Sequence, residues 1–78
     1  MQIERLVKMA NEIAQFFASE STAAEAPQNV ASHLTKYWDP RMRREIVNHG
    51  RQGGVGLSDI ARHAVGLLVL PVDTAELP

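Results

Sequence analysis

The side chains best suited to metal or acid–base chemistry in this sequence are its three histidines, at positions 33, 49 and 63. His49 follows Glu45 by four residues and His63 follows Asp59 by four, a spacing that lets an acid and an imidazole touch on one face of a helix. A metal site needs three or four converging ligands, and the sequence has neither an H-E-x-x-H motif nor a cysteine. We therefore expect local acid–histidine contacts and no metal site.

A second cluster lies in the stretch YWDPRMRREI, residues 37–46. At 100° per residue, Arg41 and Arg44 face away from the core, whereas Arg43 lies at the edge of the buried face. Trp38 and Arg43 occupy the two positions that a hydrophobic staple joins, so the arginine can lie across the indole ring. Tryptophan, tyrosine and arginine are also the residue types enriched at interface hot spots. The cluster predicts either a purely local staple or an anchor for a protein partner.

Two further patterns that can carry chemistry are weak here. The glycine-rich segment GRQGGVG, residues 50–56, has no preceding strand and no G-K-[ST], so a structural turn is favoured over a phosphate-binding loop. No serine stands beside a plausible base, and no close pair of carboxylates lies on an inward helix face. We expect no catalytic and no cofactor-binding residue, and a chain that is not an enzyme by itself.

Charge and hydropathy restrict the partners. Eight Lys plus Arg against nine Asp plus Glu give a net charge of −1, whereas nucleic-acid modules usually show a basic excess. A DNA-binding helix-turn-helix would also need a separate turn before residue 40, where the sequence has only Asp-Pro. The N-terminus carries charges within its apolar pattern, and the longest apolar run, 64–70, is far too short to span a membrane. Together with the absence of cysteine, this predicts a cytoplasmic protein that binds neither membrane nor nucleic acid.

The elements that must position these residues read as helices. Apolar residues recur at helical spacing over residues 2–18. Pro27 starts a second helix over 27–38, Asp39-Pro40 starts a third over 40–49, and Ser58 caps a fourth over 59–69. VGLLVL could be a strand by composition alone, but helical continuity from Asp59 favours a helix. The sequence predicts one all-α domain over 1–78, with three to four short helices and an irregular tail at 71–78.

The first helix has more apolar surface than one neighbouring helix needs. Met9 and Phe16, seven residues apart, form a second shoulder roughly 40 to 60° beyond the main stripe. Apolar residues also cover more than half of the circumference of the fourth helix, which is expected to be central or covered. Such a small chain is expected either to be marginally stable alone or to self-associate when isolated.

Three segments carry a resemblance to a known family: IERLVKMANEIAQFF, HLTKYWDPRMRREIV and GGVGLSDIARHAVGLL. In order and spacing, over residues 3–69, they resemble the delta subunit of cytoplasmic NAD-dependent formate dehydrogenases, with WDPRMRREI as the most specific element. The resemblance implies an accessory subunit that binds the large catalytic subunit and supports its assembly or stability. It also implies that other chains carry the molybdopterin-bound metal, the iron–sulfur clusters and the FMN, and use NAD. It leaves open whether the chain is a permanent subunit or a maturation factor, and whether the metal is molybdenum or tungsten.

These lines of reasoning converge on a set of partner-binding residues. The wide apolar surface of the first helix supplies two of them, and the aromatic–arginine cluster supplies the others. The predicted set is Met9, Phe16, Tyr37, Trp38, Arg41, Arg43 and Arg44. The alternative interpretation is a small helical DNA-binding or regulatory adaptor protein.

Overall fold

The computed structural model describes residues 2–68 of the 78-residue chain, and these residues contain four helices and no strand. In chain order the helices are α1 (Ile3–Glu20), α2 (Ala26–Tyr37), α3 (Pro40–Arg51) and α4 (Asp59–Leu67). The predicted all-α class is therefore confirmed. None of these helices is long and apolar enough to cross a membrane.

The predicted starts of α3 and α4 are correct because their capping residues do what their types favour, and the starts of α1 and α2 each differ from the prediction by one residue. The Asp39 carboxylate accepts a hydrogen bond from the Met42 amide at 2.8 Å, and Pro40 is the first residue of α3. The Ser58 hydroxyl accepts from the Ala61 amide at 3.2 Å and so caps α4. Pro27 lies in the first turn of α2, where its missing N–H leaves no helical hydrogen bond unmade.

The helix ends differ from the prediction, most clearly in α3. That helix continues through Gly50 to Arg51, so Gly50 does not end it. Gly50 is instead a point of close approach, because a Cβ there would lie 2.9 Å from Cγ1 of Val65 in α4. The left-handed conformations come later, at Gly53 and Gly54. At the other ends, α1 extends to Glu20 and α4 stops at Leu67, while the predicted tail at 71–78 lies outside the described residues.

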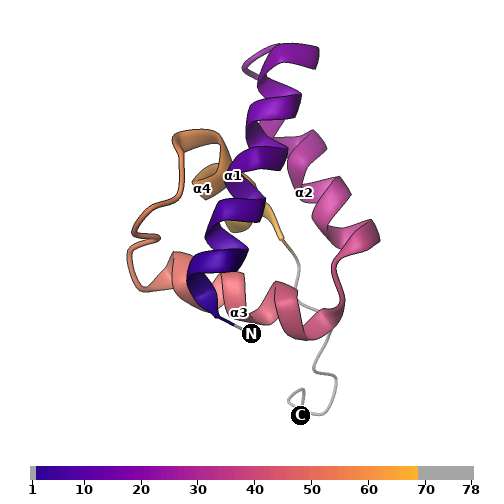
Figure 1. Cartoon of the computed structure of the whole chain (residues 1–78). Coiled ribbons are helices and arrows are strands. Elements are labelled where there is room, and N and C mark those ends of the chain that lie inside the picture. The colour runs from indigo at the N-terminus through magenta and orange to yellow at the C-terminus, as the bar shows by residue number, and fades with distance from the viewer. Residues whose placement is uncertain (1, 69–78) are drawn as a thin grey trace, which may run out of the picture.

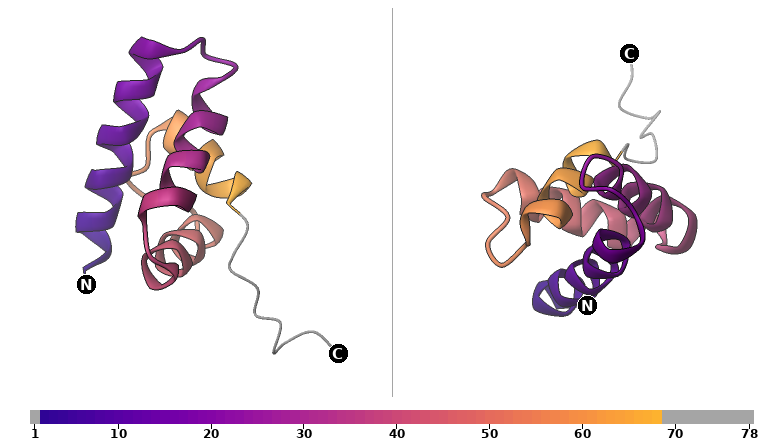
Figure 2. Two further views of the ribbon diagram at one scale, coloured as in Figure 1. Left: turned by 90° about the vertical axis from the view of Figure 1, so that its right-hand side faces the viewer. Right: turned by 90° about the horizontal axis from the view of Figure 1, so that it is seen from above.

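Helices α1, α2 and α3 all pack against α4. The first two helices run antiparallel as a hairpin, and α3 crosses near the end of that hairpin where α1 begins (Figure 1). Helix α4 contacts all three other helices, and the two rotated views show it lying against them (Figure 2). The fourth helix, which was expected to be central or covered, thus packs against every other helix but keeps Arg62, His63 and Leu67 exposed.

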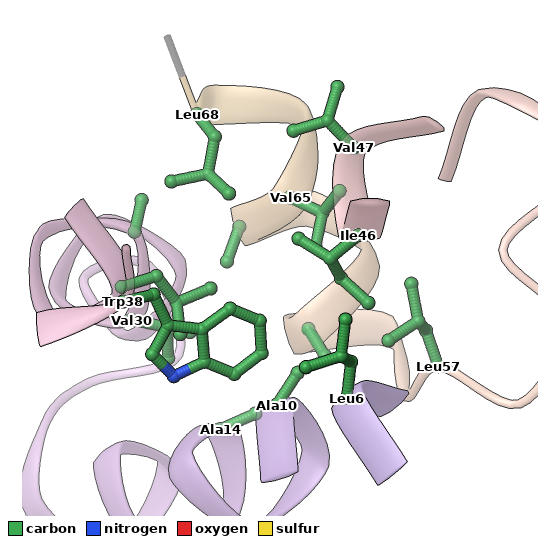
Figure 3. Close-up of a cluster of buried hydrophobic side chains, with 14 residues drawn as sticks. Leu6, Ala10, Ala14, Val30, Trp38, Ile46, Val47, Leu57, Val65 and Leu68 are labelled. Atoms are coloured by element: carbon green, nitrogen blue, oxygen red, sulfur yellow. The ribbon is translucent and has the colours of Figure 1, made fainter. Parts of the chain in front are cut away.

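The core combines alanines of α1, α2 and α4 with larger side chains from all four helices and from the loop before α4 (Figure 3). Alanines at five positions allow the helices to approach closely, and larger residues fill the remaining space. The fully buried members include Leu6, Ala10, Val30, Leu34, Ile46, Ala61 and Ala64. Trp38 belongs to the same cluster, with only 6% of its surface exposed, and its indole points inward among these residues.

Candidate functional site

A row of four ring side chains crosses from α1 to α2 on the outside of the hairpin. Phe16 and Phe17 meet edge to face with centroids 5.1 Å apart, and Phe17 contacts His33 of α2 at 6.0 Å. His33 in turn contacts Tyr37 at 4.7 Å. The ends of the row are open to solvent, with Phe16 57% and Tyr37 65% exposed. We call Phe16, Phe17, His33 and Tyr37 the aromatic face.

Apolar surface continues from the aromatic face along α1 to α3. One open hollow is lined by Met9, Glu12, Ile13, Phe16, Phe17 and His33. A neighbouring hollow is lined by Gln2, Arg5, Met9 and Met42. Because Met9 lines both, the two hollows are neighbours along α1, and together we call them the α1 trough. The wide apolar surface predicted for the first helix is therefore present, and Met9 and Phe16 both line it.

The side chain of Lys36 lies beside the ring of Tyr37. The ammonium of Lys36 lies 5.5 Å from the ring centroid, within the range of a cation–π contact. Both side chains are exposed, so the positive charge remains available beside the aromatic face. The face is consequently amphipathic at this end, with ring surface and a cation together.

The histidines do not make the acid contacts that the sequence spacing predicted. Glu45 pairs with Arg41, with its carboxylate 3.6 Å from the arginine Nε, and His49 Nε2 lies 2.8 Å from the carbonyl oxygen of Val55. His63 forms no ion pair with Asp59 within residues 2–68. The competing partners prevail because an arginine one turn before Glu45 and a loop carbonyl beside His49 are both within reach. No three His, Cys, Asp or Glu residues of the described segment converge to hold a metal.

The arginines divide as the helical wheel predicted, but Arg43 has a different partner. Arg41 and Arg44 are exposed, and Arg43 is half-buried. The Arg43 guanidinium donates through Nη1 to the carbonyl oxygen of Thr35 in the last turn of α2. Between residues 2 and 68 it makes no cation–π contact with Trp38, so the guanidinium does not stack on the indole in the way that the staple spacing allowed. The indole is turned into the core, and Arg43 satisfies a helix-end carbonyl instead.

The predicted partner-binding set is thus divided by the structure. Met9, Phe16 and Tyr37 lie along the α1 trough and aromatic face, whereas Trp38 is buried and the arginines lie on α3. Sequence reasoning missed Phe17 and His33, which join the two helices. The i,i+4 spacing of His33 and Tyr37 was a usable signal, but their pairing with Phe17 depends on how α1 and α2 meet.

The opposite flank of α1 is covered by the glycine-rich loop between α3 and α4. The Asn11 side chain donates through Nδ2 to the Gly56 carbonyl at 2.8 Å and accepts from the Ser58 amide at 2.9 Å. Gly54 and Gly56 adopt positive φ angles of 63° and 90°, which side chains disfavour. The segment is therefore a turn fixed to α1, consistent with the expectation of a structural role.

Comparison with known protein families gives one result. The family model described as the NADH-dependent formate dehydrogenase delta subunit, FdsD, matches residues 5–65, from the first turn of α1 into α4. No curated protein and no solved structure matches the chain significantly. The matched range includes the aromatic face, the cap of α3 and the loop held by Asn11. Because the match covers most of the chain, this protein belongs to the formate dehydrogenase delta-subunit family.

Proposed function

We propose that the chain is a non-catalytic accessory subunit of a cytoplasmic NAD-dependent formate dehydrogenase complex. In this proposal it binds the large catalytic subunit and supports the assembly or stability of that subunit. Family membership supports the link to the enzyme. The observation that carries a binding role is the aromatic face with its adjoining α1 trough, where Phe16 and Tyr37 remain largely exposed.

The physical argument is the free energy left unused at this surface. Burying one large apolar side chain contributes about 1.5 to 3 kcal/mol, and neither Phe16 nor Tyr37 is buried within its own chain. Aromatic side chains are enriched at the cores of interfaces because they bring a large contact area with few rotatable bonds. A partner that covers the face recovers this stabilisation.

The predicted partner-binding residues take two kinds of role in this proposal. Met9, Phe16 and Tyr37 contact the catalytic subunit directly, and the exposed Arg41 and Arg44 provide polar contacts at the edge of the interface. Two others act through the fold: Trp38 fills the core beside the exposed Tyr37, and Arg43 links α3 to the end of α2. Their loss would weaken binding by disturbing the surface rather than by removing a contact.

The redox chemistry of the complex is assigned to other subunits. An iron–sulfur cluster is held by cysteine thiolates, and this chain has no cysteine. The resemblance implies that the molybdopterin-bound metal, the FMN and the NAD site belong to larger chains. In this proposal the small subunit contacts and stabilises the catalytic subunit, and it carries neither electrons nor a cofactor.

Co-purification with a tagged catalytic subunit tests the proposal. The double substitution Phe16→Ser and Tyr37→Ser is expected to reduce recovery of the small chain to about a tenth or less, since it removes two anchors of about 1 kcal/mol or more each. The matched control is Val55→Ser with Leu67→Ser, which alters two exposed apolar residues outside the aromatic face. Equal recovery of both folded double variants would contradict the proposed surface.

A further inference from the structure

We propose that the α1 trough receives one amphipathic α-helix of the catalytic subunit, about three turns long. That helix carries an acidic and a basic side chain about seven residues apart, beside a continuous apolar face. This inference rests on the proposed function and specifies what the catalytic subunit presents to the surface described above.

The shape of the trough sets the length of its occupant. From Arg5 to Phe16 it follows α1 for eleven residue steps, about 16 Å at 1.5 Å per residue, which equals three helical turns. Its opposite wall is made by His33 of α2 and Met42 of α3. A depression between helices accepts the ridge of a further helix, and apolar residues at i, i+3, i+4 and i+7 are the usual anchors of such a ligand.

The apolar centre of the trough suits a helix that must repack on contact. Met9 lines both hollows and Met42 lines one of them, and both are partly buried against the core. Methionine side chains are flexible and polarisable, so they adapt to the shape of an incoming apolar residue. Ile13 and Phe16 complete a row that matches the two or three anchors of a three-turn helix.

Charges along the trough set the chemistry of the occupant. Arg5 lines one end, Glu12 lines the middle, and both side chains are exposed. Neither takes part in an ion pair with another described residue. The two residues are seven positions apart, or about 10.5 Å along the axis, so a helix lying beside them meets a cation and then an anion two turns away. An acid opposite Arg5 and a base opposite Glu12 complement this order and fix the register of the bound helix.

Site-specific photo-crosslinking in the assembled complex tests the occupant. Benzoylphenylalanine placed at position 9 is expected to label a catalytic-subunit peptide with helically spaced apolar residues, and with an acid and a base about seven residues apart. The same probe at His63, exposed on α4, is the control and should not label that peptide. A labelled peptide without this pattern, or labelling of a second copy of the small chain, overturns the inference while leaving association with the enzyme intact.

Charge reversal tests the order of the charges independently. Arg5→Glu and Glu12→Arg are each expected to weaken association at low salt about fivefold, and the double variant Arg5→Gln with Glu12→Gln should lose most of the salt dependence. Glu4→Arg, on the same helix but not in the trough, is the matched control. Unchanged affinity for both reversals overturns the charge assignment. A wild-type chain that does not co-purify with the catalytic subunit overturns the proposed function itself.

Discussion

The two flanks of α1 are completed in opposite ways. On one flank, the Asn11 side chain bonds both to a carbonyl and to an amide of the loop before α4, so the chain covers itself. On the other flank, Phe16 and Tyr37 keep more than half of their surface exposed. The first flank is partly covered by this loop, although Val55 stays exposed, whereas on the second flank no described residue covers the rings of Phe16 and Tyr37. The comparison favours the flank with Phe16 and Tyr37 as the surface that binds the catalytic subunit.

The difference also separates determinants of folding from determinants of association. The two hydrogen-bond partners of Asn11, Gly56 and Ser58, follow it by 45 and 47 residues in the sequence, so these bonds hold distant parts of the chain together. The exposed rings of the aromatic face make contacts that contribute less to the fold, because exposed side chains lose little on truncation. Substitutions on the loop flank should therefore change the free energy of unfolding, and substitutions on the aromatic face should change the affinity for a partner.

The largest expected effect distinguishes two adjacent residues at the end of α2. Trp38→Ala should lower the free energy of unfolding by about 3 to 5 kcal/mol, because it leaves a cavity in the core. Tyr37→Ala, at an exposed position next to it, should lower it by under about 1 kcal/mol. Urea denaturation followed by circular dichroism measures both. Similar losses for the two variants would mean that the open flank is also part of the folding core.

The second effect concerns self-association of the isolated chain through the aromatic face and the α1 trough. Phe16→Ser with Tyr37→Ser should raise the dissociation constant of any homodimer at least about tenfold, equivalent to about 1.4 kcal/mol. Sedimentation equilibrium measures this constant, and Val55→Ser serves as the control because Val55, although 77% exposed, belongs to the loop on the opposite flank. A dimer that is weakened by the Val55 substitution alone would reverse the comparison.

Local signals in the sequence were enough to predict the four helices, and they gave the starts of α3 and α4 correctly. Asp39, Pro40 and Ser58 act through neighbours within three residues, so their roles follow from residue type and spacing. Helical periodicity also identified the shoulder of Met9 and Phe16. Features that depend on tertiary packing could not be predicted in this way: α3 continues through Gly50, which lies close to Val65 of α4, and Trp38 packs into the core between helices.

The candidate site shows the same boundary between local and long-range information. The exposure of Arg41 and Arg44 followed from the helical wheel, but the Arg43 bond to Thr35 required the angle between α2 and α3. The contact of Phe17 with His33 required knowledge that α1 and α2 lie side by side. The expected Glu45–His49 contact was wrong because Arg41 and the Val55 carbonyl supplied competing partners.

The third effect tests the flank of α1 where Asn11 bonds to the loop before α4. Asn11→Ala should lower the free energy of unfolding by about 1 to 2 kcal/mol, because it removes hydrogen bonds to the Gly56 carbonyl and the Ser58 amide. Hydrogen exchange of the Ser58 amide should accelerate, whereas co-purification with the catalytic subunit should be unchanged. Asn11→Asp keeps the acceptor for Ser58 and should protect that amide more than Asn11→Ala does. Loss of co-purification by a folded Asn11→Ala variant would show that the loop also contacts the partner.

The smallest effect concerns the arginines of α3 and tests whether position relative to the core decides their role. Arg41→Ala removes an exposed i,i+4 ion pair with Glu45, so it should change the free energy of unfolding by less than about 0.5 kcal/mol. Arg43→Ala should cost more, about 1 kcal/mol, because the half-buried guanidinium is bonded to the Thr35 carbonyl at the end of α2. Urea denaturation of both variants gives the ranking. If Arg41 mattered more than Arg43, the outer face of α3 would contribute to the fold, and polar contact with a partner would no longer be the simplest role for its exposed arginines.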